Sequence, residues 1–171
     1  MRPDRTDREW INWRAETSDT SHVRALSIRQ PFAELILRGI KTIEYRSRPT
    51  RIIGERFWIY ASKSKDEGGR MKDEEVARTI WSNDLAVPGP KAGKPPAWLM
   101  ELAQELVLDK LPRGVIVGSA VIEKVVPFQL TTNDQQRTTL YEWHLADVRR
   151  TAEGELRKPL GHPQPVWFKA F

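Results

Sequence analysis

The chain has 171 residues, with a hydrophobic fraction of 39% and a charged fraction of 30%. This length suits one domain with its own core. No apolar run approaches the roughly 20 residues of a membrane helix, and the charged N-terminus lacks the apolar segment of a signal peptide. We therefore expect a cytoplasmic protein without a membrane partner.

The absence of cysteine excludes a disulfide scaffold, a cysteine nucleophile and thiolate zinc sites. The three histidines, His22, His144 and His162, lack metal-ligand spacing, so we expect no metal and no other cofactor. The P-loop, the dinucleotide-binding glycine motif, the G-x-S-x-G elbow and H-E-x-x-H are also absent. The common nucleotide, hydrolase and metalloprotease classes are therefore disfavoured.

The positive charge is concentrated in one segment. Residues 23–65 contain ten Lys or Arg and three Glu, a charge of +7, whereas the rest of the chain has 18 basic and 20 acidic residues, a charge of −2. Clustered cations gain affinity for phosphates by releasing condensed counterions. Such a segment is typical of a surface that binds a phosphate-bearing partner, and equally of a basic face exposed to solvent. The composition does not decide between the two.

The first predicted elements follow a polar N-terminal extension, residues 1–21. A single domain over residues 22–171 then begins with a strand at 23–28. The next segment is typical of a helix, because Pro31 suits its first position and Gly39 suits a left-handed residue after its end. Gln30 is a poor N-cap by type, so this helix end needs another partner or is open to a ligand.

Two strands and an insertion come next. The alternating segment TIEYRS (42–47) predicts a strand, and RFWIYAS (56–62), apolar on both faces, predicts a central or barrel strand. Residues 63–110 form a predicted helical insertion, with one helix near 72–81 and a second beginning at 97. Apolar residues at helical spacing mark the second helix: Leu99, Leu102 and Leu106.

The remaining elements are strands. Residues 113–128 are strongly β-branched, and the run Gly118-Ser119-Ala120 marks a bend or a close backbone approach. Residues 141–150 predict another strand, and the terminal PVWFKAF a short last one. These elements together predict an α+β fold, a small β-barrel with flanking helices and a two-helix insertion.

The segment GIKTIEYRS contains the most informative cluster. In a strand, Glu44 and Arg46 share one face, and Lys41 lies at the preceding turn, where it can swing toward Glu44. A surface ion pair is the simple alternative and would contribute only ~0–1 kcal/mol.

Further cations and aromatic residues surround this cluster in the sequence. Exposed bases and their phosphates are bound by cations together with aromatic faces. Core packing is the favoured interpretation for Trp58, whereas stacking and packing are equally open for Trp143. The surrounding residues of interest are Arg29, Gln30, Arg48, Lys63, Trp58, Tyr60, Tyr141 and Trp143.

The segment LSIRQPFAELILRGIKTIEYRS resembles the opening of the ASCH (activating signal cointegrator homology) domain family, part of the PUA-like superfamily. Gly39, Lys41, Glu44 and Arg46 match its G-x-K-x-x-E-x-R motif in full. GERFWIYAS, LPRGVIVGSAVI and PVWFKAF are also similar to that family. The pattern is closest to the ASCH domain of the eukaryotic transcription coactivator.

The resemblance implies a PUA-like barrel in which the motif lines a cleft and binds RNA or DNA, single-stranded or carrying a modified base. The cations are expected to contact phosphate. Glu44 and Gln30 are expected to hydrogen-bond a base edge, and Tyr141 or Trp143 is expected to stack on a base. The expected nucleic-acid-binding residues are Arg29, Gln30, Lys41, Glu44, Arg46, Arg48, Ser62, Lys63, Tyr141 and Trp143.

The resemblance also implies an alternative function. Some relatives are single-strand ribonucleases, and one branch hydrolyses N4-acetylcytidine with the motif lysine and a threonine. That threonine falls where this chain has Glu44, so the usual Thr–Lys pair is absent. A hydrolase would instead use Lys41 and Glu44 as its catalytic pair. Whether the chain is an enzyme stays open, and the Pro-rich loop at 87–96 supports a third possibility, a protein-interaction domain.

Overall fold

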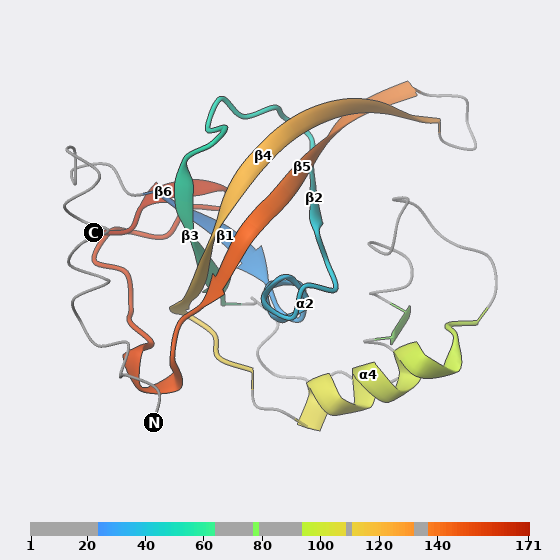
Figure 1. The fold of residues 1–171 in the computed structure, drawn as a ribbon, viewed down its shortest axis with the longest axis horizontal. Coiled ribbons are helices and arrows are strands. Elements are labelled where there is room, and N and C mark those ends of the chain that lie inside the picture. Colours follow the sequence, from blue (N-terminus) through green and yellow to red (C-terminus); the bar gives the residue numbers. More distant parts are fainter. Residues whose placement is uncertain (1–23, 64–76, 79–93, 109–110, 132–136) are drawn as a thin grey trace, which may run out of the picture.

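The computed structural model describes residues 24–63, 77–78, 94–108, 111–131 and 137–171. Strands dominate the described residues (Figure 1). In chain order, the elements are β1 (Arg24–Arg29), α2 (Phe32–Leu37), β2 (Ile43–Arg46), β3 (Arg56–Ser62), α4 (Ala97–Leu108), β4 (Val115–Thr131), β5 (Arg137–Arg150), η2 (Glu153–Glu155) and β6 (Trp167–Lys169).

The strands form one six-stranded sheet in the order β2-β5-β4-β3-β1-β6. Strands β1 and β3 are parallel, and the other neighbours are antiparallel. In Figure 1, β4 and β5 form a long curved ribbon, and α2 lies between the sheet and α4. The α+β class is confirmed. The barrel is not, because the described residues contain no backbone ladder that closes the sheet between β2 and β1 or β6.

The sheet nevertheless curls around its core. Trp143 of β5 stacks on Trp167 of β6, with ring centroids 5.6 Å apart and planes 13° from parallel. Strand β6 has only three residues, so β1 extends beyond it. There the edge strand β2 approaches β1, and Nη2 of Arg46 donates a 2.9 Å hydrogen bond to the Ser27 carbonyl. We call this region, made by Ser27, Glu44, Arg46 and Trp143, the seam.

The helix α2 begins one residue later than predicted, with Pro31 as its N-cap rather than its first residue, and it ends before Gly39 as predicted. Leu35 and Ile36 are fully buried, and Gly39 has φ +72°, the left-handed conformation expected after the helix. The N-terminal end is satisfied from within the chain. The Oε1 atom of Gln30 accepts a 3.1 Å hydrogen bond from the Glu34 amide, and its Nε2 donates to the Pro112 carbonyl at 3.0 Å.

The second helix of the insertion is present as α4, which packs onto the outer side of α2. Leu99, Ala103 and Leu106 are buried against Leu35, together with Ala77. The helix expected near 72–81 lies outside the described residues apart from 77–78, as does the N-terminal extension. The domain boundaries stay predictions.

The predicted close approach at Gly118 is confirmed. A side chain there would collide with the Arg149 carbonyl oxygen and with Leu37. The β4–β5 register also shifts between Ser119 and Val121, which bends the strand. Trp58, 8% exposed, is a core residue as expected.

Candidate functional site

Lys41 is fixed by the turn that follows α2. The backbone amides of Ile40 and Lys41 both donate to the Leu35 carbonyl, at 2.9 and 3.1 Å. The side chain points inward, and the residue is only 3% exposed. Its Nζ donates a 2.6 Å hydrogen bond to the Ile43 carbonyl and lies 3.3 Å from Oε2 of Glu44.

Two aromatic rings complete the environment of this ammonium group. Nζ of Lys41 lies 5.9 Å from the centre of the Phe32 ring and 5.5 Å from that of Tyr45. Both distances allow cation–π attraction. The Lys41–Glu44 pair is therefore not a surface ion pair, and Lys41 is held by internal contacts rather than displayed for a phosphate.

Arg46 joins this pair to the seam. Its Nη2 lies 2.9 Å from Oε1 of Glu44, so the Glu44 carboxylate is held between two cations. Its guanidinium carbon lies 5.8 Å from the Trp143 ring centre. The arginine side chain is 18% exposed and that of Glu44 11%, so the network reaches the surface only narrowly.

Two buried donors at the seam lack an acceptor. In the described part of the chain, Nε of Arg46 and Nε1 of Trp143 are buried and make no hydrogen bond. Buried N–H groups in native proteins nearly always have a partner, from the protein, water or a ligand. The seam therefore offers unused hydrogen-bond donors beside a carboxylate.

The other expected site residues divide into exposed and internal groups. Gln30 is buried, with its amide used in the internal hydrogen bonds described above. Trp143 is 1% exposed, so it presents no face on which a base could stack in this structure. Tyr141 is half-buried against the core, and Ser62 at the end of β3 is also half-buried. The exposed members are Arg29, Arg48 and Lys63.

Three exposed cations meet where neighbouring strands end. Arg29 ends β1 and pairs in register with Ser62, the last residue of β3. Strand β4 starts at the same edge, because the Gly114 amide donates to the Ala61 carbonyl at 2.7 Å. Lys63 follows β3 and Arg113 precedes Gly114, and both are exposed. We call Arg29, Lys63 and Arg113 the cationic edge.

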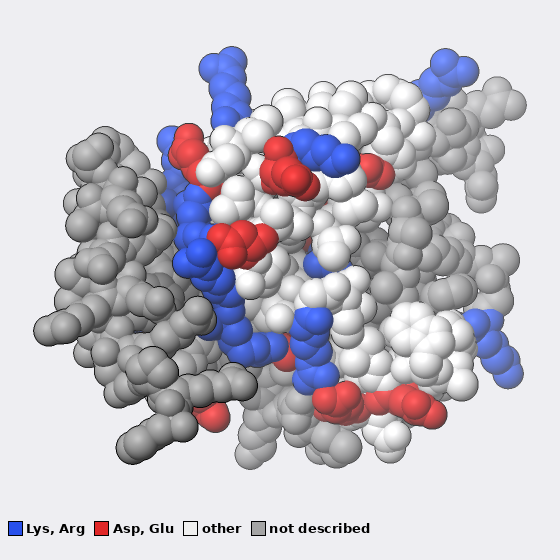
Figure 2. Space-filling view, in the orientation of Figure 1, with Lys and Arg blue, Asp and Glu red and all other residues white. Residues whose placement is uncertain are grey.

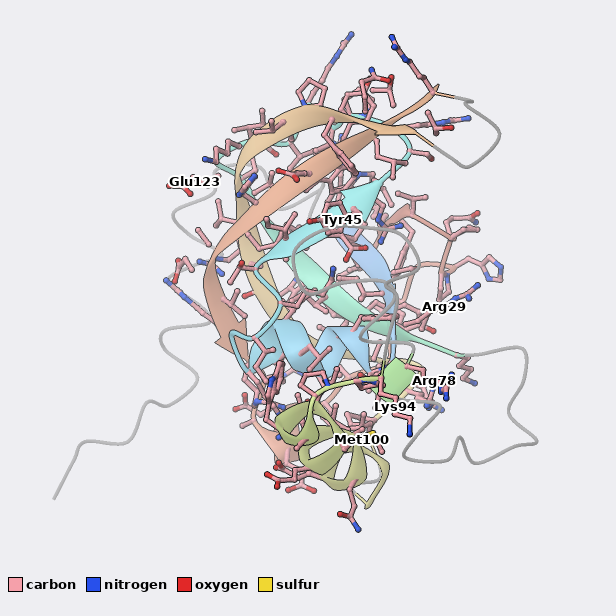
Figure 3. All side chains as sticks on the ribbon, turned by 90° about the vertical axis from the view of Figure 1, so that its right-hand side faces the viewer. Arg29, Tyr45, Arg78, Lys94, Met100 and Glu123 are labelled. Carbon is pink, nitrogen blue, oxygen red and sulfur yellow. The ribbon has the colours of Figure 1, made fainter. Side chains whose placement is uncertain are left out.

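None of these three cations has an ion-pair partner among the described residues. Figure 3 shows Arg29 on the same side of the molecule as Arg78 and Lys94, with Glu123 on the opposite side. Arg113 was not predicted as a site residue from the sequence. Only the β3–β4 register, which no local pattern reveals, brings it beside Lys63.

The face shown in Figure 2 has a different charge arrangement, with basic and acidic side chains side by side. Elsewhere, between β3 and β5, Asp147 pairs with both Arg56 and Arg149. Burial and the neighbouring Arg149 cation lower the pKa of the Arg56 guanidinium, partly opposed by Asp147. This cluster holds two cations around one carboxylate, whereas the three cations of the cationic edge have no acidic partner in the described part of the chain, which favours the cationic edge as the place for an anionic partner.

Glu34 is the most enclosed carboxylate near α2. Its Oε1 accepts from Nε of Arg38 at 2.8 Å and Nη2 of Arg150 at 2.7 Å, and its Oε2 accepts from Nη1 of Arg150 at 2.9 Å. Burial raises the pKa of Glu34, but the hydrogen bonds and charges of Arg150 and Arg38 outweigh it. The net effect is a pKa below the ordinary value.

The described residues contain neither a membrane-spanning helix nor a metal-binding cluster. No helix there is long and apolar enough to cross a bilayer. No group of three or more histidine or acidic side chains in those residues is placed to hold a metal ion.

The fold and the site together define a mostly-sheet α+β domain in which a buried Lys–Glu–Arg network lies at the seam of a curled sheet. A family model, "ASCH domain", matches residues 26–155. The chain therefore belongs to the ASCH domain family, and the resemblance seen in its sequence is confirmed.

Solved structures of ASCH from Zymomonas mobilis are similar to this chain. One crystal structure has 16% identity and a TM-score of 0.40, and the match covers 76% of this chain and 71% of that one. A serine-to-alanine mutant has 14% identity and a TM-score of 0.44, with 87% and 88% covered. A tyrosine-to-phenylalanine mutant has 14% identity and a TM-score of 0.41, with 80% and 76% covered. The search of curated proteins gave no match.

Proposed function

We propose that this chain binds single-stranded RNA or DNA along the cationic edge and the adjoining seam. The observation that carries the proposal is the row of three exposed, unpaired cations at the ends of three adjacent strands. Adjacent strands lie about 4.8 Å apart, so the row spans about 10 Å. A flexible single strand can follow such a row with successive phosphates. Membership of the ASCH family supports the same class of partner.

In this proposal the residues have distinct roles. Arg29, Lys63 and Arg113 contact phosphate, joined by Arg48, which is exposed just beyond β2. Glu44 and Arg46 face a base at the seam, where the unused Nε donor of Arg46 can bond a base acceptor. Lys41 orients Glu44 rather than contacting phosphate.

The hydrolase alternative has one observation in its favour, the buried pair of Lys41 and Glu44 with Nζ and Oε2 3.3 Å apart. Buried charged pairs of this kind occur at catalytic sites and also in structural networks. Here the carboxylate also pairs with Arg46, and the ammonium also bonds a carbonyl. Because both charged groups already have these internal partners, Lys41 is better suited to orient Glu44 than to transfer a proton. We therefore propose nucleic-acid binding as the primary function.

The test compares two variants that change the net charge equally. The edge variant carries Arg29→Gln, Lys63→Gln and Arg113→Gln. The control variant neutralises three exposed cations elsewhere: Lys124, Arg137 and Lys158. Fluorescence anisotropy with labelled single-stranded RNA and DNA should show wild-type affinity in the control and a large loss in the edge variant. Equal losses of affinity in the two variants would show that binding is only nonspecific charge attraction. No binding of any RNA or DNA at low salt would refute the proposal.

The same RNA decides the alternative. Wild type and Lys41→Met are incubated with labelled single-stranded RNA in chelator, and the products are separated on a gel. The binding proposal expects intact RNA with both proteins. Cleavage by wild type that disappears in Lys41→Met would establish the hydrolase function instead.

A further inference from the structure

A cavity of about 550 Å³ lies beside the cationic edge, within the size range of small-molecule sites. Strand β5 ends there, because Arg150 pairs in register with Gly118 near the start of β4. Pro112 lines the cavity and directly precedes Arg113 of the cationic edge. A nucleotide whose phosphate contacts the cationic edge would therefore have this cavity next to it.

One residue that lines the cavity has a buried polar atom without a partner in the described part of the chain. Thr151 lines it, is 7% exposed, and is fixed by a 3.0 Å hydrogen bond from its backbone amide to the Val117 carbonyl. Its Oγ1 is buried and has no hydrogen-bond partner in the described part of the chain. A buried hydroxyl of this kind normally bonds to water or to a ligand.

The charged groups around the cavity balance one another. Arg150 forms a bidentate pair with Glu34, which Arg38 also contacts. The Arg150 side chain is 46% exposed, so part of its guanidinium faces solvent. Glu153 adds an exposed carboxylate without an ion-pair partner in the described residues. Two carboxylates and two guanidinium groups favour a neutral polar ligand over a strong anion.

The rest of the lining is apolar. It consists of Leu111, Pro112, Val117 and Leu156. Apolar walls with a few polar groups at one end suit a flat, uncharged heterocycle, whose faces pack on aliphatic side chains and whose edge carries donors and acceptors.

We propose that this cavity is a nucleobase pocket, a recognition site separate from the seam. The base's faces pack on Val117 and Leu156, and its carbonyl or ring nitrogen accepts from Arg150. Thr151 bonds the same edge, and an exocyclic amino group donates to Glu153. The pocket therefore prefers bases with an amino group over uracil. The choice of ligand class rests on the proposed function, whereas the pocket's chemistry does not.

Free nucleosides test the pocket apart from the cationic edge, because they carry no phosphate. Equilibrium dialysis of the full chain with labelled cytidine, adenosine, guanosine and uridine should show saturable binding of the first three, little changed between 50 and 500 mM salt. Thr151→Val keeps the side chain's shape and should weaken cytidine binding about three- to tenfold, the value of one hydrogen bond. Its unfolding midpoint should not fall, because it removes an unpartnered buried hydroxyl.

A matched pair of variants tests the amino-group contact. Glu153→Ala should reduce the preference for cytidine over uridine, whereas Glu155→Ala, in the same 3-10 helix but outside the cavity lining, should not. The edge variant should bind cytidine like wild type even where it loses RNA, so the two proposals can fail independently. The inference would be overturned if no nucleoside bound saturably, or if inorganic phosphate bound and the nucleosides did not. Equal cytidine affinity in Thr151→Val and wild type would also overturn it.

Discussion

Arg46→Met is expected to destabilise the whole domain, because Arg46 spans the seam where no backbone ladder closes the sheet in the described residues. The change removes two bonds of the guanidinium group, one of 2.9 Å to Glu44 and one of 2.9 Å to the Ser27 carbonyl. It also leaves Lys41 as the remaining cation beside the Glu44 carboxylate among the described residues.

The magnitude follows from these contacts. Hydrogen bonds to charged groups contribute about 1.5–3 kcal/mol each, which gives an upper bound of about 6 kcal/mol for two. The side chain is 18% exposed, and methionine keeps most of the packing against Trp143. We therefore expect a loss of about 3 kcal/mol in the free energy of unfolding. With a urea slope of about 2 kcal/mol/M, the midpoint falls by about 1.5 M.

Urea unfolding followed by circular dichroism measures this change. Arg46→Lys is the matched control, since it keeps the charge near Glu44 but loses the Nη2 amino group that reaches both acceptors, and it should recover about half of the loss. A double-mutant cycle with Glu44→Gln should give a coupling energy above about 1 kcal/mol. A loss below about 1 kcal/mol in Arg46→Met, or no coupling, would refute the structural role of the seam.

Three further changes test other parts of the account. Glu34 has a lowered pKa in the fold, so the stability that it contributes is complete above the ordinary value of 4.5 and is lost as pH falls through the lower folded value. The stability difference between wild type and Glu34→Gln, measured by urea unfolding, should therefore shrink from pH 5 toward pH 2. A difference that stays constant would contradict this. Gly118→Ala should lower the free energy of unfolding by about 2 kcal/mol or more, because the added Cβ would meet the Arg149 backbone and Leu37. Gly154→Ala, with open space around it, should lower it by less than about 0.5 kcal/mol. Equal thermal midpoints for the two variants would count against the close approach. Lys41→Met should weaken RNA binding no more than about threefold once the variant is shown to be folded, since Lys41 is 3% exposed, and a loss as large as that of the edge variant would return Lys41 to the phosphate-contacting set.

Local patterns predicted most of the elements because the signals were local. Pro31 and Gly39 marked the limits of α2, and the apolar pattern of residues 56–62 predicted β3. The small residues around Gly118 indicated a bend or a close backbone approach, and the structure shows that approach against β5. In each case, one segment carries the information that determines its own conformation.

Long-range contacts account for what the sequence analysis missed. Whether the sheet closes depends on where the edge strand β2 lies relative to β1 and β6. No single segment of the sequence specifies that position. The inward direction of Lys41 depends on the rings of Phe32 and Tyr45 packing around its ammonium group. Trp143 is buried because Trp167, far along the chain, stacks on it. The resemblance to the ASCH family located the motif but not the cationic edge, because Arg113 reaches it only through strand pairing.

The most direct test of nucleic-acid binding at the cationic edge is the salt dependence of affinity. For single strands, the slope of log K against log salt concentration is about −0.7 per neutralised phosphate. Removing three phosphate contacts should therefore make the slope of the edge variant about 2 units shallower than that of wild type, with the control variant unchanged. Equal slopes in wild type and the edge variant would show that Arg29, Lys63 and Arg113 do not contact phosphate.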